Sequence, residues 1–143
     1  STGARIKLIP DGDDSAVIST SIENSGIDLY MGIGGSPEGV LAAAALRCLG
    51  GKIYAKLIFD DNKIFERAQS MGIKDKNTIY NTNDLARGEV MFSATGVTDG
   101  TLLKGVRFKN NIAYTHSVIM RSKTNTVRYI KATHDLNKKK LLT

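Results

Sequence analysis

The chain has 143 residues, of which 41% are hydrophobic and 24% are charged, and this composition is typical of a globular domain and excludes a disordered or fibrous chain. That length suffices for one buried core, so we expect a single α/β domain over residues 1–143. The 20 Lys and Arg outnumber the 14 Asp and Glu, but Trp is absent and no basic-aromatic pattern is present, so we expect no nucleic-acid binding.

The single cysteine, Cys48, lies in an apolar helical stretch and is expected to be a small buried side chain. One cysteine provides neither a disulfide framework nor zinc-ligand spacing, which favours a reducing compartment. The sequence contains no secretory signal and no apolar run of transmembrane length. We therefore expect a cytoplasmic protein that does not contact a membrane.

The first half of the chain alternates predicted strands with predicted helices. Expected strands are residues 5–9, 27–31 and 52–59, and expected helices are residues 13–24, 37–49 and 62–71. The strand at 27–31 is almost wholly apolar, which predicts burial on both of its faces. This β-α-β-α-β-α order predicts a sheet with parallel neighbours and right-handed crossovers.

After Gly72 the pattern changes to strands joined by short connectors. Residues 75–87 are polar and are expected to form a loop with a short helix. Strands are expected at 89–95, 106–109, 112–121 and 126–133, with hairpin connections at 110–111 and 123–125. The predicted fold class is therefore α/β, with a layered mixed sheet and flanking helices.

The stretch Gly32 to Val40 joins a predicted strand to a predicted helix and is rich in glycine. Glycines let backbone N–H groups approach an anion at the positive end of a helix dipole. Glu38 lies where that anion would bind, and a carboxylate beside a phosphate is repulsive unless a metal ion bridges them. The stretch therefore suggests metal-assisted phosphate chemistry. By itself, however, it favours the simpler alternative, a glycine-rich turn in which Glu38 complements the helix dipole.

A second acidic motif, Asp11-Gly12-Asp13, follows the first predicted strand. Residues two apart in an extended segment face the same side, so both carboxylates can bind one partner. They would accept hydrogen bonds from sugar hydroxyls or hold a hard cation. The alternative is a turn followed by a helix N-cap. Because Asp11 and Glu38 follow consecutive predicted strands, we expect them to converge at one edge of the sheet.

Other polar features carry weaker signals. The turn from Thr95 to Gly100 offers glycines, hydroxyls and a carboxylate that could line a site, but a plain turn between strands is the favoured interpretation. His116 and His134 have no third ligand at recognisable spacing and are expected to be structural.

Four stretches carry a family resemblance: KLIPDGD at 7–13, MGIGGSPEGV at 31–40, FSATGVTDG at 92–100 and THSVIMRS at 115–122. Together they resemble the class II fructose-1,6-bisphosphatases of bacteria, in consistent order along nearly the whole chain. The resemblance implies the layered α/β fold of the lithium-sensitive sugar phosphatases. It also implies metal-dependent hydrolysis of the C1 phosphate of fructose 1,6-bisphosphate, giving fructose 6-phosphate in gluconeogenesis.

Residue roles follow from the motif match. Glu38 looks like the family's catalytic, metal-associated carboxylate near the scissile phosphate. Asp11 and Asp13 look like substrate-binding residues at the sugar, and Gly35 looks like the backbone that approaches the substrate beside them. The resemblance implies Mn²⁺ or Mg²⁺ as the cofactor and a homo-oligomer, either a dimer or a tetramer.

The resemblance covers only the C-terminal half of such an enzyme. The family's N-terminal half, which carries most of the metal ligands, has no counterpart in this chain, so we expect the isolated chain to be inactive and that half to be its partner. Two alternatives stay open: hydrolysis of sedoheptulose 1,7-bisphosphate, and a non-catalytic module that binds sugar phosphates.

Overall fold

A computed structural model describes residues 3–10 and 13–138, except for the side chain of Asp13. It has a mixed α/β architecture, as predicted, with helices flanking antiparallel sheets. In chain order the elements are α1 (Asp13–Ser19), α2 (Ser36–Leu49), β1 (Tyr54–Lys56), α3 (Asn62–Ser70), β2 (Ile79–Asn81), α4 (Thr82–Leu85), β3 (Met91–Thr95), β4 (Arg107–Lys109), β5 (Ile112–Arg121) and β6 (Thr126–Asp135).

The larger sheet is organised around β5. Strand β6 pairs with β5 along its whole length, and β3 and β4 share the opposite edge of β5, because β3 pairs with residues 117–121 and β4 with residues 112–114. The hairpin turns place Asn110 and Asn125 at positive φ, 54° and 45°, a region that asparagine tolerates better than most residues. The three strands 106–109, 112–121 and 126–133 and their hairpins are thus confirmed within a residue or two.

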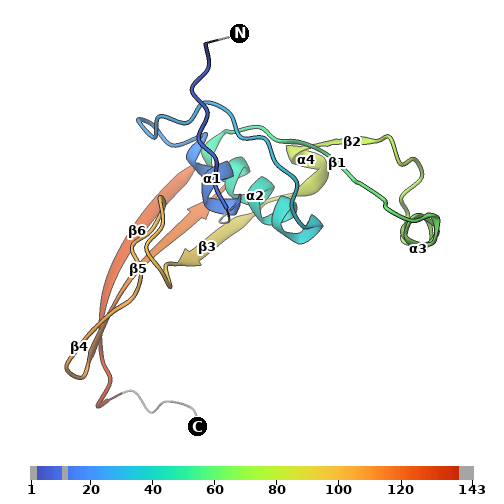
Figure 1. Ribbon diagram of the computed structural model, residues 1–143. Helices are drawn as coiled ribbons and strands as arrows, with labels where there is room; N and C mark the ends of the chain where they lie inside the picture. The colour runs from blue at the N-terminus through green and yellow to red at the C-terminus, as the bar shows by residue number, and fades with distance from the viewer. Residues whose placement is uncertain (1–2, 11–12, 139–143) are drawn as a thin grey trace.

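Helices α1 and α2 cover one face of this sheet (Figure 1). The small side chains Ala45 and Cys48 of α2 pack with Val118 and Met120 of β5, and Ile18 of α1 joins the same cluster. Cys48 is buried, as predicted, and burial raises the pKa of its thiol. The other face of the sheet, which carries Met91 of β3, has no helix packed on it among the described residues.

Two parts of the chain project from this body (Figure 1). The β4–β5 turn lies at the far end of the long β5–β6 ribbon. On the opposite side, β1 and β2 form a two-stranded sheet that carries α3 away from the core, and α3 has no buried residue. The predicted strand at 52–59 is reduced to three residues because β2, its only partner among the described residues, is equally short.

Two predicted strands are wrong, and so is the parallel sheet that depended on them. Residues 5–9 and 27–31 belong to neither sheet of the described chain, and every strand pairing there is antiparallel. Leu29 and Met31 are exposed, which contradicts burial on both faces. A local apolar pattern does not make a strand unless another strand lies beside it to pair with its backbone.

The first helix is also shorter than predicted, since α1 ends at Ser19 and not near Asn24. The hydroxyl groups of Ser19 and Thr20 donate to the carbonyls of Ser15 and Val17, both at 2.7 Å. Such local bonds compete with the helical ladder and favour its termination. Within the described residues, no helix is long and apolar enough to cross a membrane.

Met120 and Met91 provide a matched test of this packing. Met120 is 0% exposed between α2 and the sheet, whereas Met91 on the adjacent strand is 68% exposed on the opposite face. We expect Met120→Ala to lower the free energy of unfolding by about 2–5 kcal/mol because it opens a cavity. Met91→Ala should change it by less than about 0.5 kcal/mol. Urea denaturation measures both, and similar losses would show that the core is misplaced.

Candidate functional site

The glycine-rich stretch forms the start of α2, as predicted. Gly35 is the N-cap, with extended backbone (φ −68°, ψ 147°), and Pro37 occupies the first turn, where its missing N–H costs nothing. The first intrahelical bond runs from the N–H of Gly39 to the carbonyl of Gly35 at 3.1 Å. The sequence therefore fixes the beginning of α2 through local backbone preferences.

Glu38 folds back over this helix start. Its Oε2 accepts a hydrogen bond from the N–H of Gly35 at 2.6 Å. This is one half of a capping box, and the other half is missing because glycine has no side chain that could accept a bond. The carboxylate also lies at the positive end of the helix dipole and is exposed to solvent. Glu38 thus satisfies one orphan donor, while its Oε1 makes no hydrogen bond within the described residues.

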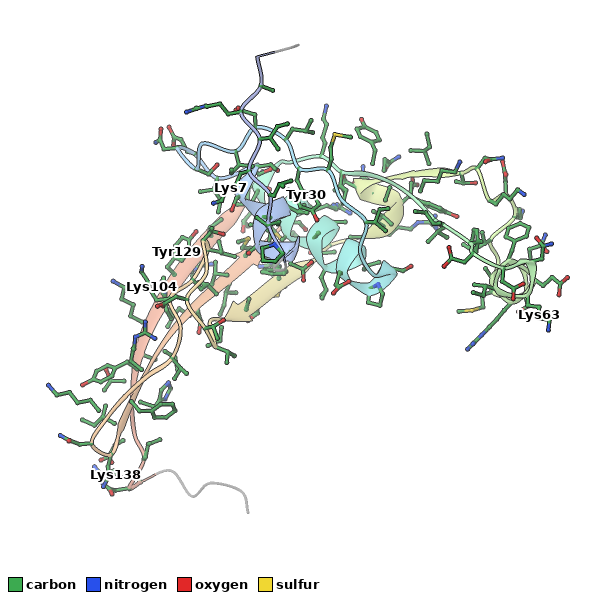
Figure 2. The ribbon with its side chains drawn as sticks, viewed as in Figure 1. Lys7, Tyr30, Lys63, Lys104, Tyr129 and Lys138 are labelled. Carbon is green, nitrogen blue, oxygen red and sulfur yellow. The ribbon has the colours of Figure 1, made fainter. Side chains whose placement is uncertain are left out.

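Two glycines of the stretch lie close to the ends of neighbouring side chains, which would have to move to admit a Cβ. A Cβ on Gly35 would lie 2.5 Å from Oε2 of Glu38, and a Cβ on Gly32 would overlap the hydroxyl group of Tyr30. Tyr30, labelled in Figure 2, packs against Val17 and Leu46 of the two helices. The stretch is therefore anchored to the α1–α2 pair immediately before the candidate site begins.

The predicted site residues are brought together only in part. Gly35 and Glu38 are in direct contact. Asp11 lies outside the described residues, and Asp13 is the first residue of α1 with an undescribed side chain. The expected shared sheet edge is absent, because neither strand that should have carried these residues to it is formed. The convergence of Asp11 and Asp13 with Glu38 stays a prediction.

The described residues do not by themselves fit a divalent metal ion. Nowhere among them do three His, Cys, Asp or Glu side chains come together in a way that could hold one. Mn²⁺ and Mg²⁺ need several oxygen ligands, and the α2 start supplies one carboxylate, Glu38. A metal centre at this position therefore requires ligands beyond the described residues.

The second glycine turn folds into a self-contained structure. Gly96 and Gly105 lie against the backbone of Lys104 and of Thr98–Asp99, where any Cβ would overlap. Asp99 accepts a hydrogen bond from the N–H of Gly105 at 2.8 Å and pairs with Arg107. The Gly105 hydrogen bond and, next, the Arg107 guanidinium lower the pKa of the Asp99 carboxyl. The Asp99 carboxylate therefore links this turn to the backbone of Gly105 and to the side chain of Arg107.

A pocket of about 220 Å³ lies between α1, β3 and this turn. Asp14 and Ser15 of α1 line it together with Gly96, Thr98 and Gly100. Three residues of this turn, Gly96, Thr98 and Gly100, thus line a cavity. The position of Asp14 in this pocket could not be predicted from the sequence, because the approach of α1 to β3 is a tertiary contact with no local signal.

Both histidines have structural partners, as predicted. Nδ1 of His116 accepts from the N–H of Lys104 at 3.0 Å, and its ring lies 5.8 Å from that of Tyr129. Nε2 of His134 is 2.9 Å from the hydroxyl oxygen of Thr115 across the β5–β6 pair.

Comparison with protein families gives one match. Residues 1–134 match the family described as bacterial fructose-1,6-bisphosphatase, glpX-encoded.

Several curated proteins are similar to the chain, and three of them share the same name, D-fructose 1,6-bisphosphatase class 2/sedoheptulose 1,7-bisphosphatase. The Synechocystis sp. protein is 43% identical, over 92% of this chain and 42% of its own length. The Trichodesmium erythraeum protein is 43% identical, over 98% of this chain and 44% of its own length. The Gloeobacter violaceus protein is 40% identical, over 96% of this chain and 43% of its own length. The chain thus spans less than half the length of these relatives.

The Asp99–Arg107 pair gives a prediction about pH. Because the pKa of Asp99 is lowered in the folded state, its bonds stabilise the fold above its unfolded pKa, and this stabilisation is lost as pH falls through the folded pKa. We expect Arg107→Gln to raise the pKa of Asp99 while leaving it below its ordinary value, because the Gly105 N–H still donates. NMR titration of the carboxyl carbon measures this shift. An unchanged pKa in the variant would contradict the ion pair.

Proposed function

Because the chain belongs to the family of bacterial fructose-1,6-bisphosphatases, we propose that it supplies part of the active site of a sugar-bisphosphate phosphatase. The observation that carries the proposal is the family match over residues 1–134 of the 143-residue chain. The proposed reaction is hydrolysis of the C1 phosphate of fructose 1,6-bisphosphate, which gives fructose 6-phosphate and inorganic phosphate.

In this proposal Glu38 is the catalytic and metal-binding carboxylate of the chain. Its placement supports the role, since the α2 start offers exposed backbone and a carboxylate within one helical turn. The substrate is bound by Asp11, Asp13 and the backbone of Gly35, in accordance with the motif match. An exposed position is what a shared site requires, because a buried Glu38 could not meet ligands from elsewhere.

The proposed cofactor is Mn²⁺ or Mg²⁺, and Glu38 is one ligand among several. Carboxylate-rich sites suit both of these hard cations, and one carboxylate is too few. The remaining ligands would come from the polypeptide that corresponds to the unmatched part of the relatives, which amounts to more than half of their length. Assembly as a homo-oligomer is also proposed.

A second candidate substrate is sedoheptulose 1,7-bisphosphate. The names of the Synechocystis and Gloeobacter relatives include sedoheptulose 1,7-bisphosphatase beside the fructose activity. Both substrates present a phosphorylated primary carbon to the same site, so parallel assays of phosphate release with each substrate would distinguish them. A non-catalytic sugar-phosphate-binding module is the alternative to either activity, and it would bind these compounds without releasing phosphate.

We expect the isolated chain to bind Mn²⁺ weakly and to release no phosphate from fructose 1,6-bisphosphate. Activity should appear when the chain is mixed with the complementary polypeptide, defined here as the part of the Synechocystis relative outside its match with this chain. The reason is that two-metal phosphatase sites need several carboxylates. A colorimetric phosphate assay with either metal measures both states. Metal-dependent turnover by the chain alone, abolished in Glu38→Ala, would contradict the proposal.

Within the active assembly, Glu38→Gln tests the role of the charge. The variant keeps the side-chain length and an oxygen that can accept from Gly35. As a dipole partner Glu38 contributes only about 0.3–1 kcal/mol, so folding should change little. If the Glu38 carboxylate is a metal ligand, its loss should lower kcat by more than about 100-fold, which corresponds to about 2.7 kcal/mol. Unfolding and turnover are measured on the same preparation, and matched small losses would assign Glu38 to capping alone.

A further inference from the structure

Two irregular segments of the chain, residues 3–10 and 27–33, carry large apolar side chains that face solvent. Leu29, Met31 and Ile33 are between 73% and 84% exposed, and Ile6 and Leu8 are 84% and 90% exposed. Neither segment pairs with a strand in the described chain, and Figure 1 shows both as coil beside the helices.

An alternating pattern covers residues 5–8 of the first segment and residues 29–33 of the second. In residues 27–33, Tyr30 packs inward against the α1–α2 pair, while its neighbours Leu29 and Met31 face outward. In residues 3–10, Ile6 and Leu8 alternate with Arg5 and Lys7, and Lys7 marks this segment in Figure 2. Alternation with a period of two is the pattern of a β-strand. The exposed apolar side chains of the two segments, Ile6, Leu8, Leu29, Met31 and Ile33, are together called the apolar edge below.

An exposed apolar edge of this kind marks an interface. Soluble proteins rarely leave contiguous apolar surface open, and an extended segment without a partner is a template for strand addition. The pattern in these segments is that of strands, and the described chain contains no partner for them. The surface therefore fits a partner that brings strands of its own.

We propose that the apolar edge is the docking surface for the complementary polypeptide, whether that polypeptide is carried on the same chain or on another. This inference rests on the proposed function. The relatives have more than half of their length outside the match, which is enough to provide such strands. The chain's net charge of +6 also suits a partner rich in carboxylates.

The docking surface adjoins the candidate site. Residues 3–10 lead directly into Asp11, and Ile33 is two residues before Gly35. Strands added along the apolar edge would end beside the start of α2, where Glu38 lies. Docking and completion of the site are therefore coupled: the same contacts that cover the apolar edge bring the partner's groups to Glu38.

The test compares lysine variants of two exposed methionines, Met31 at 84% and Met91 at 68%. Met31→Lys places a charge on the apolar edge, and Met91→Lys places one on the uncovered face of the larger sheet. Calorimetric titration with the complementary polypeptide should show about tenfold or greater weakening for Met31→Lys and no change for Met91→Lys. Circular dichroism and the methyl NMR signals of Val118 should confirm that both variants keep the core.

A second measurement tests the inference if the complementary polypeptide does not fold alone. When it is fused to the chain, the amides of residues 28–33 should become protected from hydrogen exchange, compared with the chain by itself. Equal binding by both variants, or no added protection, would overturn the inference. Self-association of the chain that Met31→Lys abolishes would also overturn it, because a second copy would then be the occupant. Docking without phosphate release would refute the proposed function while leaving the docking surface intact.

Discussion

The close packing of α2 on the larger sheet is the contact on which the rest of the structure depends. Ala45 and Cys48 are small enough to bring the helix against Val118 and Met120 of β5, and Ala42 and Leu46 hold α1 on another side of the same helix. The far end of α2 is fixed as well, because Arg47 donates to the carbonyl of Ala86 at 2.6 Å and Gly50 ends the helix at φ 81°. With its body held in this way, α2 presents its first turn at a defined place on the surface.

The same first turn is compatible with two roles, a helix cap and the proposed metal ligand. Glu38 stabilises the helix start by accepting from Gly35, and this arrangement holds a carboxylate at the surface in a defined orientation. A helix cap and a metal ligand are usually regarded as alternatives for such a residue. Here the cap uses Oε2 and leaves Oε1 without a partner among the described residues, so one side chain can serve both purposes.

Elements that depend on short stretches of sequence were predicted correctly. Asparagines at the turns, alternating strands and a Pro near the helix start were sufficient to locate β5, β6 and α2, because turn geometry and capping act within a few residues. The strands expected at residues 5–9 and 27–31 failed for the opposite reason. Their pattern is that of a strand, but a strand also needs a neighbour, and the described chain contains none for them. Only part of the candidate site could be predicted in the same way: the Gly35–Glu38 contact is local, whereas the approach of Asp14 to the pocket beside β3 depends on tertiary packing.

We propose that the start of α2 becomes one side of a metal centre when the apolar edge is covered. Paramagnetic broadening by Mn²⁺ in NMR spectra of the chain assembled with the complementary polypeptide tests it most directly, because the effect is strongest close to the ion. We expect the amide signals of Gly35 and Glu38 to broaden most strongly in the assembly, and Mn²⁺ to cause no such localised broadening in the chain alone. Sharp signals for both residues in an assembly that hydrolyses fructose 1,6-bisphosphate would contradict it.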